Sequence, residues 1–267
     1  MEIQLWKQTL RPYELAVDEL TLKFNHIIKE YAQEGVYSPI EQVSGRVKSV
    51  TSILEKAQKK SIPIDEIEEQ IEDIAGIRII CKFDEDIYAV AEIIKQRSDM
   101  EIKSYKDYIA NMKPSGYRSY HIIIYYDVET VHGKKRIQAE VQIRTLAMNF
   151  WATIEHSLQY KYRHNIPKHI KEKLNSSAEA VLLLDKEMSS VHREIMDAQN
   201  SFVIKDNIVS CILSNIQNLY KIANKKEVMK IQNEFYRIYQ EDDLEQLESF
   251  NKQLDVIAEG YRAQGIS

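Results

Sequence analysis

Glycine, proline and cysteine are scarce in this chain of 267 residues, which contains 7 glycines, 5 prolines and 2 cysteines. Because glycine and proline interrupt helices, their scarcity favours long helices. The sequence also contains no glycine-rich phosphate-binding loop of the Walker or GxGxxG kind. If the protein binds a nucleotide, side chains must therefore hold its phosphates. Cys81 and Cys211 lack the spacing of a CxxC or Cys/His metal site, so the sequence indicates neither zinc nor a disulfide framework.

Long apolar runs and an excess of positive charge are also missing. No segment approaches the roughly 20 apolar residues that span a bilayer, and residues 1–7 lack the basic-then-apolar order of a signal peptide. The formal net charge of −5 argues against nucleic-acid binding by bulk charge. We therefore expect a reduced, cytoplasmic protein with no membrane partner. RNA binding is not supported by the charge, and any basic site must be local.

The most informative stretch covers residues 136–145. Four apolar side chains alternate there with polar ones that include Glu140 and Gln142, which is the period-2 pattern of a half-buried strand. The pattern then becomes helical over residues 145–164. One strand face thus presents a carboxylate and an amide just before a helix. A plain amphipathic strand with a solvated face explains this stretch equally well when it is taken alone.

A basic cluster lies in residues 46–60, which hold five cations and one acid within an acidic protein. We expect Gly45 to interrupt any helix here and a new helix to run from about Ser49 to Lys60. Cations and a hydroxyl near a helix N-terminus suit a polyphosphate. A solvated basic face is the alternative explanation.

Residues 73–81 read as a strand that is buried on both faces. Asp73 stands at its entrance, and Arg78 interrupts the apolar run. A buried arginine needs a partner, and a structural ion pair with Asp73 or Glu72 is one explanation. Together with Glu140, Asp73 gives two carboxylates in one sheet. With the basic cluster, they suit a Mg²⁺-dependent phosphoryl or pyrophosphoryl transfer.

A third polar stretch is the strand predicted over residues 117–127, where Tyr117, Ser119 and His121 share one face. It follows a Pro- and Gly-containing loop that carries Lys113. An aromatic face of this kind can stack on a base, although tyrosine packing in the core is the competing explanation. The turn at 131–134 predicts that this strand pairs antiparallel with residues 134–144.

The remaining pattern is mainly helical. Helices are predicted over residues 2–34, 85–97 and 167–202, and a further helix start is predicted at Ser38, where Pro39 and Glu41 complete a capping pattern. Residues 100–110 are a weaker strand candidate. The tail, 203–267, contains no proline and reads as three amphipathic helices without a catalytic signature. We interpret it as a segment for packing, oligomerisation or partner docking.

Four motifs, in this order, resemble the synthetase motifs of the RelA/SpoT family, and their compact setting resembles the small alarmone synthetases of the RelQ type. The resemblance covers roughly residues 1–202. It implies an α+β nucleotidyltransferase-like domain at 1–202, with a central mixed β-sheet of about five strands flanked by helices, and leaves 203–267 as an all-α C-terminal extension. The motifs are Gly45-Arg46-x-Lys48-x-x-x-Ser52-Ile53-x-x-Lys56, Asp73-Ile74-Ala75-Gly76-Ile77-Arg78, Gly116-Tyr117-Arg118-Ser119-Tyr120-His121 and Glu140-Val141-Gln142-Ile143-Arg144-Thr145.

The resemblance implies a (p)ppGpp synthetase that transfers the pyrophosphate of ATP to the 3′-hydroxyl of GDP, GTP or GMP and releases AMP. Asp73 and Glu140 are then the catalytic residues that bind Mg²⁺, and Glu140 also helps to deprotonate the hydroxyl. Residues expected to bind ATP are Arg46 and Arg78, around adenine, and Lys48, Ser52 and Lys56, at the phosphates. Residues expected on the acceptor side are Lys113, Tyr117, which stacks on guanine, His121, Gln142 and Asn149.

The family includes tetramers that bind alarmone in a central cleft, so a homotetramer is expected. The positions that correspond to the cleft's basic and aromatic side chains are Thr21, Asn25, Ile28 and Gln42, which do not support that regulation. Two other functions stay open. One is a toxic small synthetase that modifies tRNA or adenine nucleotides, and the other is a non-catalytic helical interaction protein.

Overall fold

The computed structural model describes residues 2–161 and 166–264 of the chain. They form two compact units, one up to Ser190 and one from Val191. This division falls within a single helix, α6 (Lys168–Ile222), which also contains residue 202. The domain boundary predicted at 202 therefore stays a prediction.

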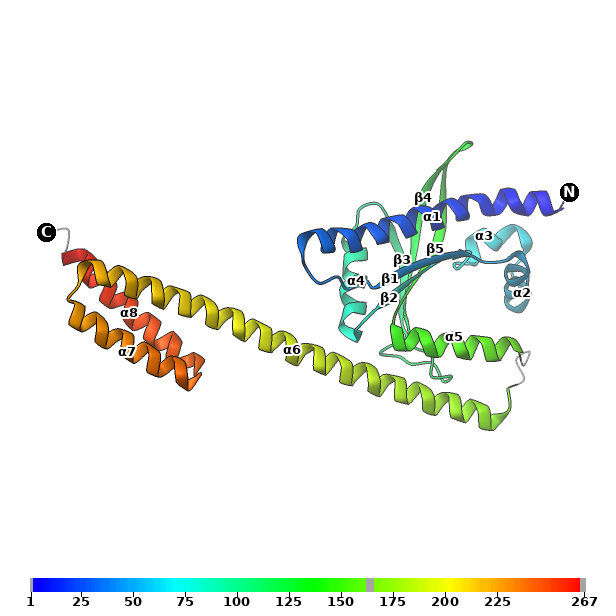
Figure 1. Cartoon of the computed structure of the whole chain (residues 1–267). Coiled ribbons are helices and arrows are strands. Elements are labelled where there is room, and N and C mark those ends of the chain that lie inside the picture. Colours follow the sequence, from blue (N-terminus) through cyan, green and yellow to red (C-terminus); the bar gives the residue numbers. More distant parts are fainter. Residues whose placement is uncertain (1, 162–165, 265–267) are drawn as a thin grey trace. The chain divides into compact units, whose positions relative to one another are not determined.

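The first unit is built on a five-stranded mixed sheet with strand order β1-β2-β5-β4-β3 (Figure 1). Strands β2 and β5 run parallel, and the other neighbouring pairs are antiparallel. This confirms the predicted α+β class and the strand number. The strands are β1 (Gln42–Val47), β2 (Ala75–Cys81), β3 (Glu101–Asp107), β4 (Tyr120–Thr130) and β5 (Gly133–Thr145).

One face of the sheet is apolar and forms the core. Alternate residues of β5, such as Val141, are buried there, as the period-2 pattern predicts. Ile77 of β2 is buried on the same face. The prediction that β2 is buried on both faces is wrong, because Gly76 and Arg78 on its other face are only half-buried. Helix α1 (Glu2–Glu34) covers this face with Leu20 and Phe24, and α4 (Asp84–Gln96) adds Ile87. The polar residues of the same strands are left on the opposite face.

Helix α1 lies very close to β1 at Gly45. A Cβ atom on Gly45 would lie 2.6 Å from both Thr21 Oγ1 and Val17 Cγ1, closer than non-bonded atoms approach. Gly45 is therefore a strand residue that lets a helix approach, not the helix breaker that the sequence predicts.

The predicted helix start at Ser38 is wrong. The Ser38 hydroxyl bonds to the backbone of Ile40, and the amide of Glu41 donates to the carbonyl of Ile80 in β2. Pairing with β2 thus outweighs the local capping signal, and the chain enters β1 instead of a helix. The helix predicted from Ser49 is confirmed as α2 (Val50–Lys60), with Ser49 as its N-cap.

The helices predicted over residues 2–34 and 85–97 are confirmed as α1 and α4. Two short helices before β2 were not predicted. The short η1 (Ile64–Glu66) and α3 (Ile67–Gln70) precede β2, and α5 (Leu146–Lys161) follows β5 directly. Trp151 of α5 packs with Ala178 of α6 in a small cluster of its own. The weak strand candidate at 100–110 is confirmed as β3.

The second unit contains the C-terminal part of α6 with α7 (Lys225–Glu241) and α8 (Leu244–Gln264). The apolar faces predicted in the tail are confirmed, because they form a separate core. The predicted helix end at 202 is wrong, because α6 continues to Ile222 and supplies the first of the three predicted amphipathic segments. The buried members of this core are Ile212, Ile216, Leu219, Val228, Phe235, Ile238, Leu247 and Leu254. Within the described residues, no helix has both the length and the apolar character needed to cross a membrane.

Candidate active site

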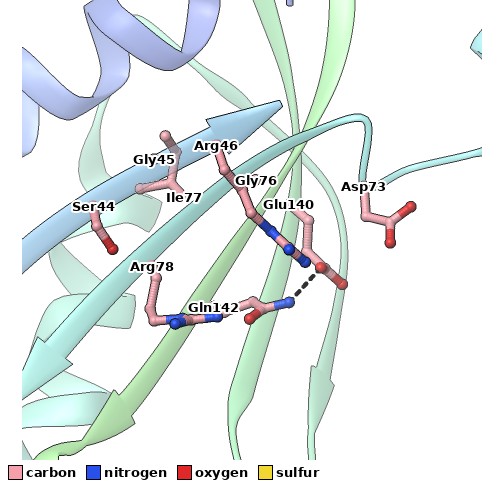
Figure 2. A pocket seen from close by; sticks show the side chains of 9 residues that line it. All are labelled: Ser44, Gly45, Arg46, Asp73, Gly76, Ile77, Arg78, Glu140 and Gln142. Carbon is pink, nitrogen blue, oxygen red and sulfur yellow. Dashed lines mark hydrogen bonds between the residues drawn. The ribbon is translucent and has the colours of Figure 1, made fainter. Parts of the chain in front are cut away.

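The polar face of the sheet is hollowed where β1, β2 and β5 lie side by side. The hollow has a volume of about 550 Å³, which includes its open mouth. Figure 2 shows charged side chains from three strands that project into it. The lining residues are Ser44, Gly45, Arg46, Asp73, Gly76, Ile77, Arg78, Glu140 and Gln142.

Strand register brings the predicted donor and acceptor residues together. Arg78 of β2 pairs in register with Gln142 of β5, and Gly76 pairs with both Glu140 of β5 and Arg46 of β1. Because Gly76 has no side chain, space remains between Arg46 and Glu140. The parallel pairing of β2 and β5 therefore places the two predicted halves of the site on neighbouring strands.

Asp73 lies in the turn before β2 and makes two ion pairs. Its carboxylate oxygens lie 2.8 Å from Lys48 Nζ and 2.8 Å from Lys56 Nζ. Burial raises the pKa of the Asp73 carboxyl, but the two lysines outweigh this effect and hold the pKa below its usual value. The site thus keeps an ionised carboxylate beside two of the cations predicted to bind phosphate.

Arg78 does not form the structural ion pair that the sequence left open. Glu72 pairs with Lys103 (2.9 Å) and Lys106 (3.5 Å) instead. Arg78 Nε is buried without a hydrogen-bond partner in the described structure. Burial and the nearby Arg46 both lower the pKa of Arg78. Two close guanidinium groups at the hollow suit a planar or anionic ligand.

Glu140 is held by hydrogen bonds to both carboxylate oxygens. Oε1 lies 2.9 Å from His121 Nδ1, and Oε2 accepts from Gln142 Nε2 at 2.7 Å. Burial raises the pKa of Glu140, but the bonds with His121 and Gln142 keep the pKa below its usual value. Glu140 is therefore an ionised and oriented base.

Tyr117 links this group to the preceding loop. Its hydroxyl lies 2.9 Å from His121 Nε2 and accepts a bond from Arg144 Nη2 at 3.0 Å. Lys113 Nζ lies 4.8 Å from the centre of the Tyr117 ring and 4.2 Å from that of Tyr108. Tyr117 and Lys113 thus lie beside His121, although β4 begins only at Tyr120.

Two predicted site residues, Ser52 and Asn149, make no hydrogen bond or ion pair with the other site residues in the described structure. The hydroxyl of Ser52 bonds with Ser49 at the start of α2. Asn149 lies on α5, and its Oδ1 atom is buried without a partner in the described structure. Their assignments to ATP and to the acceptor stay predictions.

The sequence interpretation missed three residues of the site. Ser44 was not placed because β1 itself was not predicted, and Gly76 contributes only by lacking a side chain. Arg144 donates to Gln142 Oε1 at 2.6 Å as well as to Tyr117. The period-2 pattern of β5 already puts Arg144 on the face of Glu140 and Gln142, so this residue was within reach of sequence reasoning.

A metal would depend on Asp73 and Glu140. The described residues contain no group of three His, Cys, Asp or Glu side chains that could hold an ion. Mg²⁺, however, is usually held by one or two carboxylates together with substrate phosphates. Two ionised carboxylates that line one hollow, beside lysines suited to phosphate, fit that arrangement.

Comparison with known proteins agrees with this geometry. The family model described as "Region found in RelA / SpoT proteins" matches residues 45–165. GTP pyrophosphokinase YjbM of Bacillus subtilis is 52% identical over 202 residues, which are 76% of this chain and 95% of that protein. GTP pyrophosphokinase YwaC of the same organism is 43% identical over 192 residues, which are 71% of this chain and 91% of YwaC.

A solved structure of a small alarmone synthetase is also similar to this chain. The small alarmone synthetase 1 of Bacillus subtilis bound to its product pppGpp has a TM-score of 0.70 and 52% identity, and the match covers 72% of this chain and 98% of that one. About a quarter of the present chain thus has no counterpart in these relatives, while they are matched almost entirely. The chain belongs to the RelA/SpoT family and, within it, to the small alarmone synthetases.

Proposed function

We propose that this protein is a (p)ppGpp synthetase, an ATP-dependent GTP or GDP 3′-pyrophosphokinase. The observation that carries the proposal is the register of β2 and β5. It sets Arg46, Arg78 and the ion-paired Asp73 on one side of the hollow, and Glu140 with its hydrogen-bonded neighbours on the other. Two nucleotides that bind to these two groups meet at Glu140.

The reaction gives a role to each of the two groups of residues that line the hollow. The 3′-oxygen of the acceptor forms a bond to the β-phosphorus of ATP, the bond between that phosphorus and the α,β-bridging oxygen breaks, and AMP leaves. Glu140 accepts the proton of the 3′-hydroxyl. On the donor side, Lys48 and Lys56 neutralise phosphate charge, and Arg46 and Arg78 stack on adenine.

On the acceptor side, Tyr117 supplies a face for guanine, and His121, Gln142 and Lys113 surround the ribose and phosphates. Asp73 and Glu140 are the groups that would hold Mg²⁺, which supplies charge neutralisation at the pyrophosphate when bound. The Asp73 carboxylate must then exchange at least part of its pairing with lysine for the ion.

The quaternary state and location are part of the same proposal. We infer a homotetramer on the family resemblance and a cytoplasmic location, where ATP and guanine nucleotides are available. The synthetase domain is assigned to residues 1–202 and the helical extension to 203–267.

The test is AMP release by the full chain with ATP and Mg²⁺, with GMP, GDP, GTP, ATP and tRNA compared as acceptors. We expect release with a guanine nucleotide and loss of at least ~100-fold in Glu140→Gln. AMP release only with tRNA or ATP would identify the toxic type of synthetase. Near-full activity of Glu140→Gln would overturn the mechanism, and no release with any acceptor would favour a non-catalytic interaction protein.

A further inference from the structure

The loop between β3 and β4, residues 108–119, carries Lys113 and Tyr117, and we call it the acceptor loop. It contains turns but no helix or strand. Within its tip, the amide of Gly116 donates to the carbonyl of Lys113 at 2.9 Å, and the amide of Lys113 lies 3.4 Å from the carbonyl of Tyr117. These bonds shape the tip, whereas its position relative to the rest of the fold depends on other contacts.

Arg118 joins the acceptor loop to α6. The residue is 6% exposed, and its Nη1 atom donates to the backbone carbonyl of Ala178 at 2.9 Å. Its Nη2 atom lies 3.0 Å from the sulfur of Met112, a weak acceptor on the other side of the tip. One buried guanidinium therefore binds a helix and both ends of the tip at once.

A second contact brings the same helix against the loop. Gly116 has a φ of +85°, and a Cβ atom there would lie 2.5 Å from Ala178 Cβ and 3.4 Å from Trp151 Cζ2. The side-chain amide of Asn175 also donates to the carbonyl of Pro114 at 3.4 Å. Helix α6 thus lies directly behind the tip of the loop, at a point where both the space and the backbone conformation require glycine.

We propose that Arg118 is a positioning residue for the acceptor nucleotide, because it fastens the acceptor loop to α6 and so sets where Tyr117 and Lys113 meet that nucleotide. Tyr117 contacts His121 on the sheet, while its neighbour Arg118 contacts Ala178 on the helix. This short segment is therefore held from both sides. The contact itself is independent of any substrate, and its effect on the acceptor rests on the function proposed above.

The burial of Arg118 is costly, which argues for a role beyond filling space. Burial lowers the pKa of its guanidinium, although the charges of Asp185 and Glu179 oppose this effect. Among the described residues, its hydrogen-bond partners are one carbonyl and one thioether, and it forms no ion pair. A buried cation without a direct counter-ion costs free energy. An apolar side chain would avoid that cost, but it would lack a directed bond to α6.

The kinetic test compares Arg118→Met with the wild-type full chain, with GDP and ATP varied in turn. Methionine keeps an apolar stem but donates no hydrogen bond. We expect KM for GDP to rise about 10-fold, as when a substrate-positioning group is displaced. We expect KM for ATP to stay within about twofold, because the proposed donor residues lie on other elements. A purely structural role would lower the amount of active enzyme and leave both KM values unchanged.

Two further variants complete the kinetic series. Arg118→Lys keeps the charge and a donor, so its KM for GDP should lie between those of the wild type and Arg118→Met. Arg136→Met is the matched control, because Arg136 is an exposed arginine of β5 that pairs with Glu101, away from α6. Its replacement removes the same charge, and we expect both KM values to stay unchanged.

Trp151 gives a readout that needs no activity. It is 5% exposed and packs with Ala178 and Tyr117 behind the loop. The chain has two tryptophans, so Trp151 is the only one left in a Trp6→Phe background. Without nucleotide, we expect acrylamide to quench its fluorescence more strongly when Arg118→Met is added to this background. Adding Arg136→Met instead should leave the quenching unchanged.

The proposal is overturned if Arg118→Met leaves KM for GDP unchanged, if it raises KM for ATP equally, or if the quenching of Trp151 does not increase. Arg118→Gln, which is shorter and uncharged, takes the same tests if Arg118→Met does not fold. A protein that shows the expected quenching but neither binds GDP nor releases AMP would contradict the proposed function. The attachment of the loop to α6 would then stand without a role at the acceptor.

Discussion

Lys48 Nζ lies 2.8 Å from Asp73 Oδ2, so a residue predicted to bind phosphate is paired directly with a residue predicted to bind metal. Lys56 occupies the other carboxylate oxygen. Phosphates would compete with Asp73 for both lysines, and their arrival would free the carboxylate for a cation. Donor binding and metal binding are therefore expected to support each other.

Replacing Lys48 with methionine tests this relationship. The substitution removes one charge-assisted bond to phosphate, worth about 1.5–3 kcal/mol, so kcat/KM for ATP should fall roughly 10- to 100-fold. The KM for GDP should change little. Lys60→Met, an exposed lysine at the end of α2, is the matched control. An unchanged KM for ATP would assign the pair with Asp73 to stability alone.

Tyr117→Ala should weaken the acceptor side alone. Loss of one stacked base costs about 1–3 kcal/mol, which corresponds to a rise of roughly 5- to 150-fold in KM for GDP or GTP. Steady-state kinetics with each nucleotide varied in turn give the measurement. An equal rise in KM for ATP would show that Tyr117 does not act on the acceptor in particular.

The buried carboxyl of Asp185 should make the free energy of unfolding fall as the pH rises. Burial raises the pKa of this carboxyl from 3.8 to about 6, although Thr145 donates a hydrogen bond to it. Between these values the native state binds more protons than the unfolded state, so the free energy of unfolding decreases with rising pH. At pH 7 this loss amounts to at most about 3 kcal/mol.

Asp185→Asn keeps an acceptor for Thr145 and removes the ionisation. It should raise the free energy of unfolding above pH 6 and leave it nearly unchanged at pH 4, as measured by urea denaturation at a series of pH values. If the difference between the two proteins did not grow between pH 4 and pH 6, the buried carboxyl would not be the cause.

Gly45→Ala and Gly76→Ala form a matched pair on neighbouring strands. The added methyl group at Gly45 meets α1 at 2.6 Å, whereas the nearest atom at Gly76 is Arg46 O at 3.7 Å. We expect Gly45→Ala to lower the free energy of unfolding by about 1–3 kcal/mol. Gly76→Ala should change it far less. Equal effects would mean that α1 adjusts freely to the extra volume.

Phe235→Ala tests the division into two domains. Phe235 is buried in the core of the second unit beside Phe250. Its truncation should cost about 3–5 kcal/mol there, seen by hydrogen exchange of α7 and α8. AMP release should be unchanged. A parallel loss of AMP release would show that the extension takes part in catalysis.

The elements that the sequence predicted well carry strong local patterns. The alternation along β5 and the turn at 131–134 are local signals, and they predict that hairpin without reference to the rest of the chain. Strand β1 was missed because its formation depends on residues far away in sequence. It requires pairing with β2 and the close approach of α1 at Gly45, and local capping residues near Ser38 suggested a helix instead.

The site was predictable in its composition but not in its contacts. The motifs named Asp73, Arg78 and Glu140, but spacing alone could not show that Asp73 would pair with two lysines. Nor could it show that Arg78 would make no ion pair among the described residues. Those contacts depend on how the turn before β2 meets α2 in three dimensions. Arg144 differs, because its place on the face of Glu140 follows from strand periodicity alone.

The parallel contact between β2 and β5 also bears on how such an enzyme can diversify. The proposed donor residues lie on β1, β2, α2 and the link between β1 and α2, and most of the proposed acceptor residues lie on β4, β5 and the loop before β4. Adjacent strands are spaced about 4.8 Å apart by their backbone hydrogen bonds. The distance between the two nucleotide sites is then set by the backbone. Substitutions in the loop at 108–117 can therefore change the preferred acceptor without changing the ATP site.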